Sequence, residues 1–280
     1  MLSNPKAAIV VDGAPDHPVT DIVQELAKAN GFYFSREDSR RAASQVLHKS
    51  PKLGSQTVFL LLCTEGLTES SIADAVANLK DQRPDAARIV VYAQDGEWSG
   101  SLALDCIEAG ACDFLVRTSY DRPQLMDRFS RALLGLPAYP RFRNVASLTR
   151  GSSVFIVTPF APDARQDCNS GISIALKRLG IDPFLADYEL RPSFLQGSIC
   201  EQIKERKLVI ANISQYGGAA NANVYFEIGY TRGQEIPVLL VRHRSQEKVP
   251  SDLQGVEYLE YDTCADLALR LYFGLREPVT

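Results

Sequence analysis

The chain has 280 residues, of which 45% are apolar and 23% charged, a composition typical of folded globular proteins with room for two domains. Its formal net charge is −4, and neither half carries an excess of basic residues, which argues against nucleic acid as a partner. The longest apolar run, near Val58–Cys63, is far shorter than the ~20 residues that span a bilayer. The residues before Ala7–Val11 do not have the pattern of a signal peptide. We therefore expect a cytoplasmic protein that does not bind membranes.

The residue types that hold metals or cofactors are scattered. The six cysteines lack metal-ligand spacing, and the three histidines stand far apart in the sequence. This distribution predicts reduced thiols rather than disulfides, no metal site and no His-based triad. The chain also lacks the glycine pattern of dinucleotide-binding folds and the lysine motif of phosphate-binding loops, so we expect no cofactor and disfavour hydride or phosphoryl transfer.

In the first half, short β-branched runs alternate with amphipathic stretches, a pattern that predicts a parallel sheet covered by helices. The expected strands are Ala7–Val11, Gly31–Tyr33, Thr57–Cys63, Arg88–Ala93 and Asp113–Val116. The expected helices are Asp21–Ala29, Ser70–Gln82, Ser99–Ala109 and Arg122–Leu134. These elements fit the size of a doubly wound domain, which we place at residues 1–135.

The stretch Ala109–Leu133, which reads AGACDFLVRTSYDRPQLMDRFSRAL, resembles the end of response-regulator receiver domains. The resemblance implies self-phosphorylation through an acidic pair, an acceptor aspartate, a Thr or Ser and a Lys at four strand ends. At those strand ends this chain has Asp12 followed by Gly13, Cys63-Thr64-Glu65, Ala93-Gln94 and Arg117-Thr118. Without an acceptor carboxylate, we expect a pseudo-receiver that serves regulation, oligomerisation, small-ligand sensing or binding of a protein partner.

Residues 135–151 contain two prolines, two glycines and no apolar period, and we assign 136–151 as a linker. The expected strands of the second half are Val154–Val157, Pro183–Ala186, Leu208–Ile213, Pro237–Val241 and Tyr258–Tyr261. The expected helices are Arg165–Leu179, Phe194–Arg206, Val224–Gly233 and Cys264–Phe273. The predicted fold class is therefore α/β, with two doubly wound, flavodoxin- or Rossmann-like parallel-sheet domains in tandem, the second at 152–280.

Polar residues follow the buried third strand of this second domain. Asn212 and Ser214 stand at its carboxyl end, where open α/β sheets bind ligands. The small residues 217–220 would let a ligand approach the backbone closely. We interpret Asn212 and Ser214 as candidate substrate-binding residues.

A helix follows, and either Asn221 or Asn223 fits the position of its N-cap. Either choice is expected to place Glu227 in the first turn, where the helix dipole favours an ionised carboxylate. The i+4 spacing puts Asn223 and Glu227 on one helix face. We interpret Glu227 as the candidate catalytic residue and Asn223 as a binding residue.

Three features of the second half occur together: a first strand that ends in Thr-Pro-Phe, a strand that reads IANIS, and the stretch NANVYFEIGYTRGQEIPVLLV. Over about 153–275 this combination resembles the nucleoside 2-deoxyribosyltransferase-like and TIR-like nucleotide-binding superfamily. The resemblance implies that a helix glutamate, here Glu227, attacks the anomeric carbon of the sugar and expels the base. It implies a nucleoside, nucleotide or NAD-like dinucleotide as ligand. We also expect a homo-oligomer, with the pseudo-receiver half as the regulatory or oligomerising part.

One position departs from that resemblance. Relatives commonly have Asp where this chain has Asn212, and an amide bonds a sugar hydroxyl but cannot act as a base. Asp187 is a candidate substitute acid or a solvated loop residue, while Thr158 and Phe160 either border a base pocket or, for Phe160, pack in the core. Two further interpretations stay open: a non-catalytic nucleotide-binding sensor and a scaffold that binds only proteins.

Overall fold

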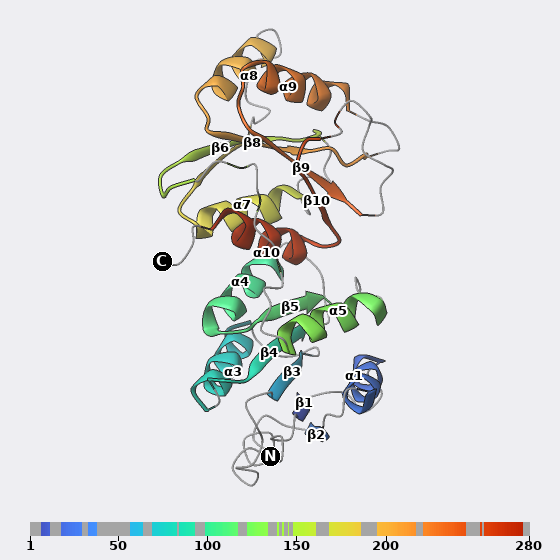
Figure 1. The fold of residues 1–280 in the computed structure, drawn as a ribbon. Coiled ribbons are helices and arrows are strands. Elements are labelled where there is room, and N and C mark those ends of the chain that lie inside the picture. Colours follow the sequence, from blue (N-terminus) through green and yellow to red (C-terminus); the bar gives the residue numbers. More distant parts are fainter. Residues whose placement is uncertain are drawn as a thin grey trace. The chain divides into compact units, whose positions relative to one another are not determined.

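The computed structural model divides the chain into two compact units (Figure 1). The first comprises Met1–Asp95 and Ser101–Ala138, and the second comprises Gly96–Gly100 and Tyr139–Thr280. The structure describes residues 7–11, 18–29, 33–37, 57–63, 69–82, 84–92, 99–116, 122–133, 139, 142, 145, 148–160, 168–185, 195–216, 221–244, 253 and 255–276. Each unit is built around one five-stranded sheet whose paired strands all run parallel.

The sheet of the first unit has the strand order β2-β1-β3-β4-β5. Its strands are β1 (Ala7–Val11), β2 (Tyr33–Glu37), β3 (Thr57–Cys63), β4 (Ala87–Tyr92) and β5 (Asp113–Val116). This order is that of flavodoxin-like and receiver domains, in which a parallel sheet is wound in both directions from its first strand. The predicted receiver-like fold class of this half is confirmed.

Helices cover both faces of this first sheet, with α1 and α5 on one side and α3 and α4 on the other (Figure 1). They are α1 (Pro18–Ala29), α3 (Glu69–Gln82), α4 (Ser99–Ala109) and α5 (Arg122–Leu133). Helix α4 ends at Gly110, whose φ of 113° requires a residue without a side chain. The next amide, that of Ala111, donates to the carbonyl of Cys106 at 2.8 Å and closes the turn into β5. This turn explains the Ala-Gly-Ala sequence in physical terms.

A buried ion pair joins β5 to α5 in the first unit. Arg128 Nε lies 2.7 Å from Asp113 Oδ2, and Arg128 Nη2 donates to Asp113 Oδ1 at 3.0 Å. Asp113 also accepts a bond from the amide of Phe114 at 2.9 Å. Both side chains of the pair are buried, and each places an opposite charge beside the other.

The sheet of the second unit has the order β10-β9-β8-β6-β7, which repeats the same winding. Its strands are β6 (Ser153–Val157), β7 (Asp182–Leu185), β8 (Leu208–Asn212), β9 (Val238–His243) and β10 (Tyr258–Tyr261). The winding direction reverses between β6 and β8, which are neighbours in register from Val154 opposite Leu208 onward. Ligands of doubly wound sheets bind at the carboxyl ends of the two strands on either side of such a reversal.

Figure 1 shows α8 and α9 on one face of this second sheet and α7 and α10 on the other. The helices are α7 (Ser170–Arg178), α8 (Leu195–Lys204), α9 (Ala222–Gly233) and α10 (Cys264–Leu275). All five residues of β8 are buried, which is what a central strand covered on both faces requires. None of the described helices in either unit is long and apolar enough to cross a membrane.

The fold class with two doubly wound parallel sheets is confirmed, and most strand positions agree with the sequence pattern within one or two residues. The second strand of the first unit is the exception: it occupies Tyr33–Glu37 rather than Gly31–Tyr33. The predicted helix over Arg165–Leu179 corresponds to α7, but its residues 165–167 lie outside the described part of the chain.

Candidate functional site

Three of the predicted site residues gather at the carboxyl ends of β6 and β8. Asn212, fully buried at the end of β8, donates from Nδ2 to Thr158 Oγ1 at 3.4 Å and to Tyr216 Oη at 3.2 Å. Its Oδ1 accepts a bond from the amide of Ser214 at 3.0 Å. The Asn212 amide is thus committed to the protein itself, since both kinds of its polar atoms have internal partners. Through its bond to Thr158, Asn212 links the carboxyl end of β8 to that of β6.

A network of hydroxyl groups extends from Asn212, and the sequence analysis missed most of it. Ser214 Oγ accepts a bond from the amide of His243 at 3.0 Å. Tyr216 and Tyr261 also bond to Ser214, and burial raises the pKa of both phenols. Tyr261 further contacts the sulfur of the buried Cys168. These residues come from four separate segments, so no spacing in the sequence reveals that they meet.

Helix α9 begins differently from the prediction. Asn221 is its N-cap: the backbone is extended, and Oδ1 accepts bonds from the amides of Asn223 at 3.0 Å and Val224 at 3.3 Å. With the helix starting at Ala222, Glu227 lies in the second turn, and the first turn has no acidic residue. The expectation that Glu227 occupies the first turn is therefore wrong. Because the dipole effect fades beyond the first turn, it does not hold this carboxylate ionised.

The Glu227 side chain is partly buried, and its carboxyl is close enough to Cys200 of α8 to affect that thiol. Its burial raises the pKa from 4.5 to about 7. The Cys200 thiol of α8 has a raised pKa as well, first through burial and then through the nearby Glu227 carboxyl. Among the described residues Glu227 has no hydrogen-bond or ion-pair partner for its carboxyl oxygens. A partly buried carboxyl without a compensating charge and with a pKa near neutral pH is typical of a functional group.

The remaining predicted residues are placed less tightly. Asn223 is exposed one helical turn before Glu227, on the same side of α9. Phe160 follows the end of β6 with 37% of its surface exposed, so it is not part of the core. Asp187 lies outside the described residues. So do most of the first-unit strand-end positions, namely Asp12, Thr64, Glu65, Ala93, Gln94, Arg117 and Thr118. Within the described part of the chain, no three Cys, His, Asp or Glu side chains gather closely enough to hold a metal ion.

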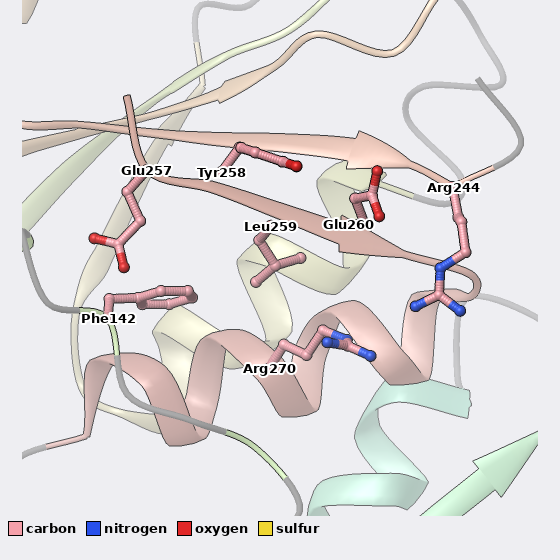
Figure 2. A pocket seen from close by; sticks show the side chains of 7 residues that line it. All are labelled: Phe142, Arg244, Glu257, Tyr258, Leu259, Glu260 and Arg270. Atoms are coloured by element: carbon pink, nitrogen blue, oxygen red, sulfur yellow. The ribbon is translucent and has the colours of Figure 1, made fainter. Parts of the chain in front are cut away.

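A pocket of about 320 Å³ lies elsewhere in the second unit, along the edge strand β10. Figure 2 shows Arg270 reaching from α10 toward β10, with Leu259 above it and Phe142 beside Glu257. The two arginines that line the pocket already form ion pairs: Arg270 with Asp266 and Arg244 with Asp262, each at 2.8 Å. None of the predicted site residues lines this pocket, and its charges are compensated from within the protein. We therefore place the candidate site at the Glu227 side of the sheet.

Solved structures similar to this chain include response-regulator receiver domains and a deoxyribosyltransferase, the two families that the sequence motifs resemble. A response regulator from Thermotoga maritima is 18% identical over 46% of this chain and 98% of its own, with a TM-score of 0.38. A receiver domain protein from Clostridium thermocellum is 14% identical over 47% and 95%, with a TM-score of 0.36. A 2-desoxiribosyltransferase from Leishmania mexicana is 17% identical over 32% of this chain and 64% of its own, with a TM-score of 0.29. No protein-family model matches the chain and no curated protein matches its sequence; likeness at this level does not extend to activity.

Proposed function

We propose that the second unit cleaves the N-glycosidic bond of a nucleoside, a nucleotide or an NAD-like dinucleotide, with Glu227 as the nucleophile. The observation that carries the proposal is the state of the Glu227 carboxyl: partly buried, without a hydrogen-bond or ion-pair partner among the described residues, and with a pKa of about 7. A strongly shifted pKa at a carboxyl with no compensating partner is a feature that clusters at functional sites.

In the proposed reaction, a Glu227 carboxylate oxygen forms a bond to the anomeric carbon of the sugar. The bond from that carbon to the base nitrogen breaks, and the base leaves with the electron pair: a nucleobase takes up a proton from solvent water, whereas the cationic nicotinamide of an NAD-like ligand leaves as a neutral base. The resulting glycosyl ester is then attacked at the same carbon by water, which releases the sugar and restores the carboxylate. A second base in place of water gives transfer instead of hydrolysis. A raised pKa suits this role, because a more basic carboxylate is a better nucleophile once ionised.

For the first unit we propose a regulatory or oligomerising role. Its strand order is that of receiver domains, while its sequence has Cys63 and Thr64 where an acceptor aspartate is expected. A domain of this kind would act through contacts with a protein partner or a second copy rather than through phosphorylation.

A non-catalytic nucleotide sensor is the second candidate, and the internal bonding of Asn212 favours it. An acid at this position could contact sugar hydroxyls, whereas the Asn212 amide is bonded to Thr158, Tyr216 and the Ser214 amide. Because the Asn212 amide is bonded within the protein, the site can still bind a nucleotide but has one polar group fewer that could act on it.

The test is to incubate the full chain with a panel of nucleosides, nucleotides and NAD and to measure released base by chromatography. The proposal predicts release by the wild type and a loss of several orders of magnitude in Glu227→Gln. The matched control is Glu201→Gln on α8, whose side chain is 70% exposed and paired with Lys204, and which should keep wild-type release. Ligand binding without release of any base would favour the sensor.

A further inference from the structure

A second polar side chain lacks partners on the other face of the same sheet. Asn169 precedes α7 and is only 5% exposed, yet neither its Oδ1 nor its Nδ2 has a hydrogen-bond partner among the residues that the structure describes. It stands at the N-cap position of α7 but does not cap the helix, because its backbone is already helical, with φ −67° and ψ −36°. Buried amides are nearly always bonded, so an exception of this kind requires an explanation.

The position of Asn169 relates it to the candidate site. Its neighbour Cys168 contacts the Tyr261 hydroxyl, which belongs to the network that reaches Asn212 at the carboxyl edge of the sheet. Gly171, two residues on, faces α10, since a Cβ there would lie 3.2 Å from Leu267. Residues two apart on a helix point to nearly opposite sides. The Asn169 side chain therefore projects away from α10 while remaining enclosed near the carboxyl edge of the sheet.

We infer that Asn169 is a second recognition point of the proposed glycosidic-bond site, binding a flat ligand group that presents a hydrogen-bond donor beside an acceptor, such as a nucleobase or a carboxamide. An amide carries an acceptor and a donor side by side, so it forms two parallel hydrogen bonds with such an edge. Neither polar atom of the Asn169 amide is bonded within the described part of the chain, in contrast to those of Asn212 at the end of β8.

The inference rests on the proposed function and specifies its substrate further. Glu227 lies on α9 and Asn169 lies at the start of α7, on opposite faces of the sheet (Figure 1). A ligand that meets both must cross the carboxyl edge near the reversal between β6 and β8, as ligands of doubly wound sheets do. The substrate therefore has two recognised ends, with the bond to be cleaved near Glu227 and a second base or carboxamide at Asn169. A dinucleotide has this form, and a single nucleoside does not.

The first test needs no ligand and compares two buried asparagines under the same substitution. Leucine has nearly the shape of asparagine without its polar atoms. In Asn169→Leu the removal of an unpartnered amide should raise the midpoint of thermal unfolding of the full chain by about 3 °C. In Asn212→Leu, where three internal hydrogen bonds are lost, the midpoint should fall. A fall in both variants would show that Asn169 is bonded within the protein and would overturn the inference.

The second test measures binding by calorimetry in the Glu227→Gln background, so that no probe is consumed. The probes are NAD, AMP and nicotinamide mononucleotide. We expect NAD to bind more tightly than either half, and Asn169→Leu to weaken NAD about tenfold while leaving one of the two halves unaffected. Equal binding of NAD with and without the substitution, or no binding of NAD at all, would overturn the inference. Failure of the proposed function has a different signature: the wild type releases no base from any substrate, or it releases base at a rate that does not depend on Glu227.

Discussion

Replacing Glu227 by Gln should change how the stability of the protein depends on pH. Burial raises the pKa of this carboxyl from 4.5 to about 7, so between these values the folded chain holds a proton that the unfolded chain has lost. The neutral carboxyl therefore does not reduce the free energy of unfolding at acidic pH. As the pH rises toward about 7, the unfolded chain loses its proton first, and the free energy of unfolding falls. The pKa difference corresponds to about 3 kcal/mol, most of which falls between pH 5 and pH 8. Gln mimics the neutral carboxyl and removes this dependence.

The assay is urea unfolding of the full chain at pH 5 and at pH 8. Relative to wild type, Glu227→Gln should gain about 2–3 kcal/mol of unfolding free energy between the two pH values. Glu201→Gln is the control: it removes a carboxyl on the neighbouring helix whose side chain is 70% exposed, and it should gain little. If Glu227→Gln parallels the wild type at both pH values, its carboxyl is solvated in the folded protein and the reasoning about its environment fails.

Three further outcomes follow from the described contacts. Asn221→Ala should cost about 1 kcal/mol of stability in urea unfolding, and Asn223→Ala less than about 0.5 kcal/mol; equal costs would show that the cap is misassigned. Asp113→Ala should cost about 3–5 kcal/mol because it removes one partner of a buried ion pair, whereas Asp127→Ala breaks an exposed pair and should cost less than about 1 kcal/mol. Base release should rise as the pH increases through about 7, because only ionised Glu227 attacks; a rate that falls over this range would contradict a nucleophilic role.

Much of the fold follows from local pattern. Strands β5 and β10 and helix α4 begin and end where the sequence predicts, because their apolar runs or periods are bounded by turn residues. Strand β2 was misplaced because Tyr33–Glu37 reads YFSRE, which has no continuous apolar run, and edge strands of parallel sheets need none. The tandem repetition of one strand order likewise follows from the alternation of strands and helices.

The candidate site was only partly predictable. The sequence marks Asn212, Thr158 and Glu227 as residues near strand or helix ends, and the first two meet. It could not distinguish two asparagines that both fit an N-cap, since the choice depends on which one has an extended backbone. Nor could it reveal that partial burial raises the pKa of Glu227, opposite to the direction expected from the helix dipole. Enclosure arises from packing between segments far apart in the chain, which periodicity does not encode.

The most direct measurement of the central claim is mass spectrometry of the protein after rapid acid quenching during reaction with a cleavable nucleoside or nucleotide. A glycosyl ester intermediate predicts a mass gain of one sugar residue, located on the peptide that contains Glu227 and accompanied by an equal amount of free base. The gain should be missing in Glu227→Gln. Base release that proceeds with no sugar on this peptide, at the same rate in wild type and in Glu227→Gln, would contradict the account.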